Sequence, residues 1–202
     1  LELANNVNSL LISKYIQRKD YDSAQMLIDK LPNVSINKKQ LQANLYISQD
    51  KLKDACEILE KEIIFMANSI QSSLLNLINI ALKQNKFDYA LIYSDKIKQT
   101  TEIYNLWDYN KYIGYYEIAM KTKDTKKIVD TLKSMLNSIK KPWTLNNSPL
   151  YKHICDNPKS NSNDNKLGQI LINNIIKELE CSDEIDFLRK EPEFIELLNE
   201  YK

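Results

Sequence analysis

The chain has 202 residues with 28 basic and 27 acidic side chains, so its formal net charge at pH 7 is only +1. A domain that binds DNA or RNA by itself usually carries a clear basic excess, and this balance argues against direct contact with nucleic acid. The chain contains only 2 glycines and 5 prolines, whereas a sheet protein of this length would need more turn residues. The composition therefore predicts an all-α protein.

The hydropathy and the cysteines indicate a cytoplasmic protein. Mean hydropathy is −0.47, and no uninterrupted apolar run approaches the ~18 residues that a membrane-spanning helix needs, so we expect no membrane contact. The cysteines are odd in number, lack CxxC spacing and are expected to be reduced thiols: Cys56, Cys155 and Cys181. The chain begins with Leu1 and not with methionine, which we interpret as the start of a fragment.

Apolar residues recur at helical spacing over most of the chain, and short polar turns separate the periodic segments. Four helix pairs are expected: 3–18 with 21–31, 36–48 with 51–65, 69–84 with 87–98, and 102–121 with 125–139. Pro32 should end the second helix, and Ser35 is the expected N-cap of the third. Each helix has one apolar face that needs a neighbour.

The periodic pattern ends after Lys141. Residues 142–166 are predicted to form a bent connector that leads into a short helix and then a mobile polar loop at 156–165. Closing helices are expected at 167–180, 183–189 and 192–201. The predicted organisation is therefore 1–141 for the helix pairs, 142–166 for connector and loop, and 167–202 for C-terminal capping helices.

Four segments of the sequence can be aligned with one another: 15–24, 46–55, 81–90 and 119–128. Successive segments lie 31, 35 and 38 residues apart, and their residues resemble the tetratricopeptide repeat (TPR), whose usual period is ~34 residues. The family's consensus positions are occupied by Leu11, Tyr15, Ala24, Ile28, Ala43, Tyr46, Ala55, Leu59, Leu77, Ala81 and Ala90. The consensus Trp and closing Pro are missing, and Ile128 stands where the fourth unit should have Ala. The resemblance implies a right-handed α-solenoid of TPR-like helical hairpins.

The TPR resemblance also implies a binding surface, because the first helices of TPR units line a concave groove. Transferring the repeat register places four residues at the groove-facing position, with Gln40 and Asn76 beside them: Ser13, Asn44, Asn79 and Glu117. An asparagine amide can donate and accept hydrogen bonds at once, so such a row can hold the backbone of an extended peptide. The alternative is an ordinary polar solvent face in a chain rich in asparagine.

The residue types that catalysis needs are not grouped in this sequence. The only histidine, His153, lies two residues from Cys155, and side chains at that spacing do not face each other on a helix. A phosphate-binding loop cannot be built from Gly114 and Gly168 alone. The acidic groups are expected on solvated helix faces or first turns: Glu57 with Glu60, and Asp183, Glu184 and Asp186. We therefore expect no enzyme, no cofactor and no metal.

Two further surface features have open interpretations. The lysine-rich stretch 121–141 is either a patch for an acidic partner or a solvated face. An aromatic cluster is either an interface or a filling for gaps between repeats: Tyr104, Trp107, Tyr109, Tyr112, Tyr115 and Tyr116.

A second resemblance lies in SPLYKHI (148–154) and FLRKEPEFIELL (187–198). These segments resemble the tails of helical-repeat regulators from low-GC Gram-positive bacteria, including the peptide-sensing quorum regulators of the RRNPP type. The resemblance implies the peptide-binding regulatory domain of a cytosolic transcription regulator that can form a homodimer, although the chain has no recognisable DNA-binding unit. The alternative is a TPR scaffold that mediates protein–protein interaction without sensing a small ligand.

Overall fold

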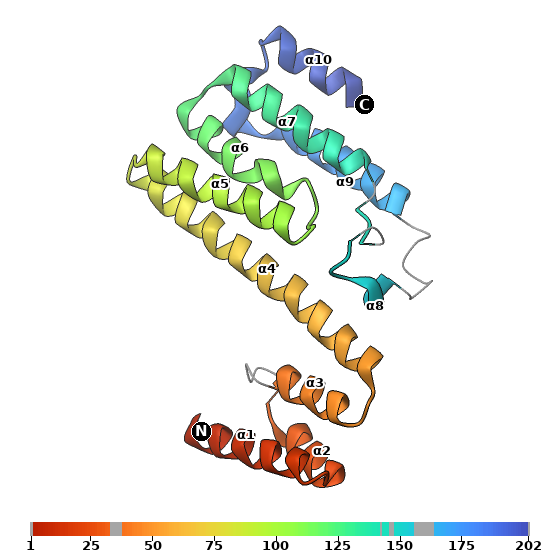
Figure 1. Ribbon diagram of the computed structural model, residues 1–202. Helices are drawn as coiled ribbons and strands as arrows, with labels where there is room; N and C mark the ends of the chain where they lie inside the picture. The colour runs from red at the N-terminus through yellow and green to blue at the C-terminus, as the bar shows by residue number, and fades with distance from the viewer. Residues whose placement is uncertain (1, 33–37, 142, 146–147, 156–163, 202) are drawn as a thin grey trace. The chain divides into compact units, whose positions relative to one another are not determined.

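The computed structural model describes residues 2–32, 38–141, 143–145, 148–155 and 164–201. Within these ranges every regular element is a helix, as the composition predicted (Figure 1). The helices are α1 (Glu2–Gln17), α2 (Tyr21–Lys30), α3 (Lys38–Ser48), α4 (Leu52–Lys83), α5 (Phe87–Ile103), α6 (Asn110–Thr122), α7 (Thr125–Lys140), α8 (Lys152–Cys155), α9 (Asp164–Cys181), η2 (Asp183–Leu188) and α10 (Pro192–Tyr201).

The chain divides into two compact units. Unit 1 comprises Leu1–Phe65 and Pro149–Asp156, and unit 2 comprises Met66–Ser148 and Asn157–Lys202. The division falls within α4, so that the first part of this helix belongs to unit 1 and the rest to unit 2.

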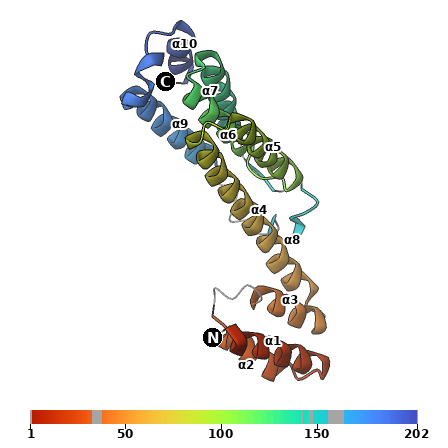
Figure 2. The same ribbon diagram turned by 90° about the vertical axis from the view of Figure 1, so that its left-hand side faces the viewer.

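The prediction of separate helices at 51–65 and 69–84 is wrong, because α4 runs without a break from Leu52 to Lys83 (Figures 1 and 2). The expected gap, residues 66–68, holds Met, Ala and Asn, and none of these residues stops a helix as Pro or Gly would. One 18-residue window of α4 has a mean hydropathy of 1.3. By length and composition alone, α4 could therefore cross a membrane, although no uninterrupted apolar run suggests it.

Other predicted boundaries shift by smaller amounts. The helix expected to start at 102 starts at Asn110, since α5 extends to Ile103 and a turn follows. The last closing helix lies where it was expected, whereas α9 begins at Asp164, within the predicted loop 156–165. The rest of that loop and the predicted N-cap Ser35 lie outside the described residues.

The four aligned segments share one turn geometry. Each turn contains a non-glycine residue with φ between 53° and 60°: Lys19, Asp50, Asn85 and Lys123. In each, the next N–H donates to a carbonyl five residues earlier, as in Asp20 N–H to Tyr15 O at 3.0 Å and Lys86 N–H to Ala81 O at 2.9 Å. This is the Schellman pattern that ends helices. The small residues of the alignment, Ala24, Ala55 and Ala90, are buried, and so is Ile128 in the fourth segment.

In unit 1, α1, α2 and α3 enclose an apolar core that includes Ile12, Ile28 and Leu45. The segment that carries α8 is held by a side chain of α4. Glu60 Oε2 accepts hydrogen bonds from the backbone N–H groups of His153 and Ile154, both at 3.0 Å, and Glu60 Oε1 lies 2.5 Å from His153 Nδ1. Glu60 is only 9% exposed, so the expectation that it lies on a solvated face is wrong.

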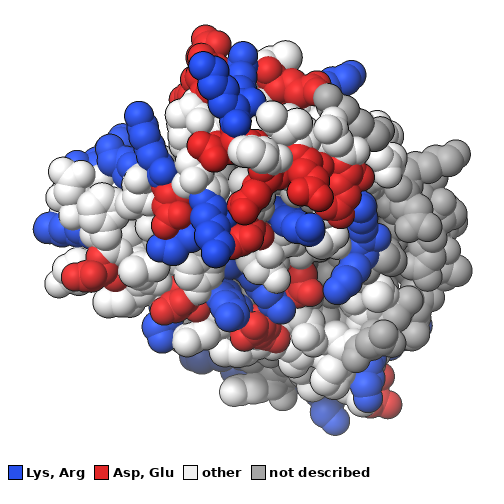
Figure 3. All heavy atoms as spheres, turned by 90° about the horizontal axis from the view of Figure 1, so that it is seen from above, with Lys and Arg blue, Asp and Glu red and all other residues white. Residues whose placement is uncertain are grey.

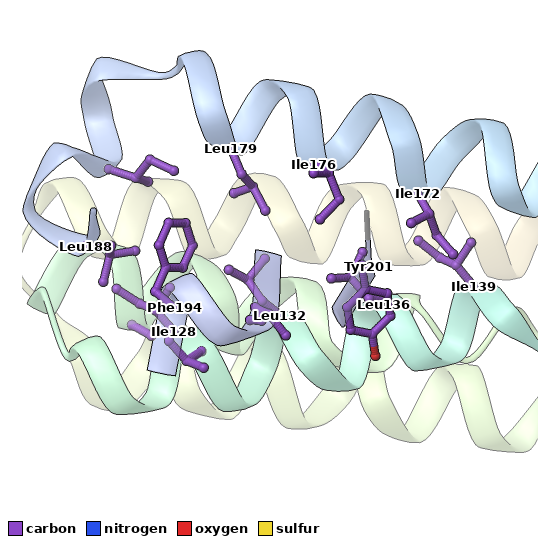
Figure 4. Close-up of a cluster of buried hydrophobic side chains, with 14 residues drawn as sticks. Ile128, Leu132, Leu136, Ile139, Ile172, Ile176, Leu179, Leu188, Phe194 and Tyr201 are labelled. Carbon is purple, nitrogen blue, oxygen red and sulfur yellow. The ribbon is translucent and has the colours of Figure 1, made fainter. Parts of the chain in front are cut away.

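In unit 2, the main core is formed by α7, α9, η2 and α10 (Figure 4). The cluster contains Leu132 and Leu136 of α7 together with Ile176 of α9 and Phe194 of α10. Such burial of large apolar side chains is the dominant stabilising term in folding.

Glycine and a polar network hold α6 against α4 and α5. A Cβ on Gly114 would lie 2.4 Å from Ser94 Oγ and 2.8 Å from Ile78 Cδ1, so only glycine permits this approach of α6. Gln71 is buried on α4; its Nε2 donates to Thr101 Oγ1 at 2.6 Å and its Oε1 accepts from Asn110 Nδ2 at 2.8 Å. These contacts fix the start of α6, which lines the cavities described next.

Candidate ligand-binding cavities

The first cavity, here called the acidic cavity, lies in unit 2 among α6, α7, α9 and η2 and has a volume of about 350 Å³. Apolar and aromatic side chains form much of its wall, including Tyr116, Met120 and Ile175. Among the described residues that line it, three are carboxylates and none is basic: Glu117, which is half-buried, and Glu178 and Glu184, which are exposed. The volume falls within the usual range of small-ligand pockets, about 300–1,000 Å³.

The titratable groups of the acidic cavity are affected first by burial and then by neighbouring carboxylates. Burial raises the pKa of Glu117, and repulsion from Glu184 raises it further. Burial raises the pKa of Tyr116 to about 12, and the charge of Glu117 adds to this effect. Burial likewise raises the pKa of Tyr109, followed by the charge of Glu178. A cation in this cavity would relieve the repulsion and restore easy ionisation of Glu117.

The second cavity, here called the tryptophan cavity, has a volume of about 480 Å³ and lies between the α5–α6 turn, the end of α7 and the connector. The chain has 2 tryptophans, and both line this cavity: Trp107 and Trp143. Its charged lining residues balance in number, with Glu102 and Asp108 against Lys111 and Lys141.

The acidic side chains of the tryptophan cavity are compensated by a lysine. Lys111 Nζ lies 2.9 Å from Asp108 Oδ1 and 3.7 Å from Glu102 Oε1. Burial acts to lower the pKa of Lys111, but the hydrogen bond and charge of Asp108, together with the charge of Glu102, outweigh it and raise that pKa. Because its charges balance, this cavity does not favour the binding of an ion.

One residue fixes the connector wall of the tryptophan cavity. Asn105 has φ 45° in the turn after α5. Its carbonyl accepts from Trp143 Nε1 at 3.1 Å, and its Nδ2 donates to Ser148 Oγ at 2.7 Å. Asparagine is among the few residue types that adopt this backbone region readily. The backbone and the side chain of Asn105 together hold the turn after α5 against the connector.

An aromatic pair belongs to both cavities. Trp107 lines the tryptophan cavity and Tyr109 lines the acidic cavity. Their rings are stacked, with centroids 5.1 Å apart and an interplanar angle of 25°. All six residues of the predicted aromatic cluster are half-buried, and three of them pack against the core of unit 2: Trp107, Tyr109 and Tyr116.

The residues predicted to face a groove are placed as follows. Ser13, Gln40 and Asn44 are exposed in unit 1, and Gln40 and Asn44 lie one turn apart on α3. Asn76 and Asn79 are exposed on α4 in unit 2, and neither lines a cavity described above. Of the predicted set, only Glu117 lies in a cavity. Asn44 and Asn79 belong to different units, so the predicted row of amides remains a prediction.

The sequence did not predict which charged residue affects the pKa of Glu117. Glu184 is exposed in the first turn of η2, as expected, and it also lines the acidic cavity and raises the pKa of Glu117. The two residues are far apart in the chain, and no local pattern pairs them. The high density of tyrosine and tryptophan around 104–116 was the one available signal, since it marks this part of the chain as unusual.

In the view of Figure 3, basic and acidic side chains are interspersed over the surface. Within the described part of the chain, no group of three or more His, Cys, Asp or Glu side chains is arranged to hold a metal ion. Cys56 is half-buried and Cys181 is exposed, and both are free thiols.

No protein-family model matches this chain, and no curated protein or solved structure matches it significantly. The fold and the two cavities therefore define a class only: an all-helical protein with two ligand-sized cavities in one of its units.

Proposed function

We propose that this chain is a peptide-binding regulatory domain of TPR type, and that the acidic cavity takes a basic side chain of the peptide. The observation that carries the proposal is the acidic cavity itself, which is lined by aromatic and apolar side chains together with three carboxylates, and by no basic side chain among the described residues. A lysine or arginine side chain fits this environment, because its alkyl stem packs on apolar surface while its head pairs with carboxylates.

The TPR part of the proposal is supported by the recurrence of one turn. The same hydrogen bond closes the turn at all four aligned segments, and the small residues that TPR packing requires are buried. We therefore propose that the helices stack as a right-handed solenoid with C-terminal capping helices. The proposed contacts of the peptide backbone are exposed polar side chains: Ser13, Gln40 and Asn44 in unit 1, and Asn76 and Asn79 in unit 2.

The proposed setting is the cytoplasm of a low-GC Gram-positive bacterium, where the domain would sense a short peptide for a transcription regulator. Support for this setting comes from the SPLYKHI and FLRKEPEFIELL segments. In the structure, the first of these supplies the buried Tyr151 and the backbone donors that bind Glu60. The second supplies Leu188, Phe194 and Leu197 of the unit 2 core.

A peptide-library experiment tests the function. Libraries of about seven residues, long enough to span two repeats, carry Arg, Gln or Glu at a fixed central position and are otherwise random. The protein should retain the Arg library selectively, and Glu117→Gln should lower affinity by roughly 10- to 100-fold through loss of a charge-assisted contact. Glu196→Gln, an exposed residue on α10 outside both cavities, is the matched control.

The outcomes distinguish the two functional classes. Equal retention of the three libraries, or equal loss in Glu117→Gln and Glu196→Gln, would remove the acidic cavity from the function. Retention of no peptide library, together with capture of a folded partner protein, would favour the scaffold alternative.

A further inference from the structure

The tryptophan cavity has no part in the proposed peptide site, and its lining combines aromatic rings with many hydrogen-bonding groups. Trp107 and Trp143 contribute the two indoles, and Trp143 is 42% exposed. Carboxylate, ammonium and hydroxyl groups from the same unit also line the cavity: Glu102, Asp108, Lys111, Lys141, Thr144 and Ser148. A ligand that fits this lining needs an apolar face together with several polar groups.

The aromatic part of the cavity is held in place by contacts within the protein. Trp143 Nε1 donates to the Asn105 carbonyl at 3.1 Å, which fixes the indole against the turn after α5. Trp107 is fixed from another side, because its ring stacks on Tyr109 with centroids 5.1 Å apart. Side chains that are ordered before a ligand arrives lose little conformational entropy when it binds.

The ion pairs of the cavity restrict the charge of its ligand. Lys111 already pairs with Asp108 and Glu102, so a cationic ligand would have to compete with it for both carboxylates, and an anionic ligand would meet their repulsion. Lys111 approaches Asp108 Oδ1 and Glu102 Oε1, and the second oxygen of each carboxylate can accept a hydrogen bond from a ligand. These charges favour a neutral ligand that donates hydrogen bonds.

We propose that the tryptophan cavity binds a neutral sugar, with one face of a pyranose ring against the indole of Trp143 and its hydroxyl groups bonded to Glu102, Asp108 and Lys141. A pyranose whose hydroxyls are equatorial has faces made of polarised C–H groups, which the negative face of an indole attracts. Each hydroxyl donates and accepts, and carboxylates beside ammonium groups match both roles. The proposal is independent of the peptide-binding function, which involves the other cavity.

Ligand-observed saturation-transfer NMR on the full chain tests the proposal with sugars that differ in charge. Methyl β-glucoside and cellobiose are the neutral probes, and both should bind with Kd values on the order of 1–10 mM. Their C–H protons on one face of the ring should receive the most saturation. Glucosamine, with an ammonium group, and glucose 6-phosphate, with an anionic group, should each bind about tenfold more weakly than methyl β-glucoside.

Variants of the lining test which groups hold the sugar. Trp143→Ala should weaken binding of both neutral probes by about tenfold, while Trp143→Phe, which keeps an aromatic face, should lose much less. Tyr89→Ala is the matched control, because Tyr89 is an exposed aromatic residue of unit 2 outside both cavities. Circular dichroism melts check that the variants are folded.

A change of charge in the cavity gives a second, independent readout. Lys111→Met leaves Glu102 and Asp108 without their shared cation, so glucosamine should then bind more tightly than methyl β-glucoside, the reverse of the wild-type order. This reversal does not depend on the stability of Trp143→Ala.

Three outcomes would overturn the proposal. The first is that neither neutral probe binds the wild type at about 50 mM. The second is that Trp143→Ala binds both probes like Tyr89→Ala, and the third is that the order of the charged and neutral sugars is the same in the wild type and in Lys111→Met. Adenosine, which is neutral and aromatic, serves as a comparator, and tighter binding of adenosine than of cellobiose would also overturn it.

Discussion

The two cavities of unit 2 hold carboxylates in opposite electrostatic situations. In the tryptophan cavity, Lys111 lies between Asp108 and Glu102 and neutralises them. In the acidic cavity, burial and then the charge of Glu184 raise the pKa of Glu117, and none of the described residues that line it is a cation. Acidic residues therefore indicate a cation-binding site only where the fold places no basic side chain beside them. The net charge of +1 for the whole chain does not reveal this difference.

The largest effect is expected from Gly114→Ala, which tests whether both cavities depend on the close packing of α6 against α4 and α5. The new Cβ would lie 2.4 Å from Ser94 Oγ, so α6 must shift, and unfolding should become easier by about 1–3 kcal/mol. Chemical denaturation measures this change. Lys121→Ala is the control, since Lys121 is exposed on the same helix; an equal loss in the two variants would contradict the close approach of α6.

Acid should weaken peptide binding at the acidic cavity. The pKa of Glu117 is raised above its ordinary value, so its carboxylate takes up a proton earlier than usual as the pH falls, and a cation then loses its partner. Affinity for an Arg-containing peptide should fall by up to about tenfold per pH unit below that pKa. Calorimetric titration measures the dependence, and Glu117→Gln should bind weakly with a flatter profile over the same range. A wild-type affinity that does not change with pH would exclude Glu117 as the ionised partner.

Removing one charge from each cavity should change stability in opposite directions. A raised acid pKa means that the folded state prefers the protonated form, so Glu117 stabilises the fold at low pH and loses that contribution as the pH rises through its folded pKa. Glu117→Gln should therefore raise the melting temperature at neutral pH. Lys111→Met leaves Asp108 and Glu102 uncompensated and should destabilise the fold by about 0.5 kcal/mol, because these partners are half exposed. Changes of the same sign in both variants would contradict the comparison.

The smallest effect is expected from Trp143→Phe. This change removes the hydrogen bond from Trp143 Nε1 to the Asn105 carbonyl, at a cost of no more than about 0.5 kcal/mol because the side chain is 42% exposed. Its value lies in the readout, since Trp107 then remains as the only tryptophan and stacks on Tyr109 of the acidic cavity. Fluorescence of this variant should respond to a peptide bound in the acidic cavity, whereas an unchanged spectrum at saturation would show that the peptide lies elsewhere.

The sequence was sufficient for the features that depend on near neighbours. The all-helical class, the ends of most helices and the four equivalent turns follow from apolar spacing and from turn residues such as Asp50 and Asn85, because these signals act within a few residues. The helix break expected at residues 66–68 is absent for a reason that is also local. The repeat alignment suggested that a helix ends there, but the residues at these positions do not end a helix.

The cavities and their charges could not be read from the sequence. Glu60 and Glu117 each look like ordinary helix-surface acids, and only tertiary structure buries the first against His153 and sets the second beside Glu184. Local sequence determined where this chain forms helices and where it turns, because those choices depend on backbone hydrogen bonds and side-chain periodicity within a few residues. Tertiary structure alone decided which carboxylates are compensated and which are not, because desolvation and charge repulsion depend on groups that the fold brings together from distant parts of the chain.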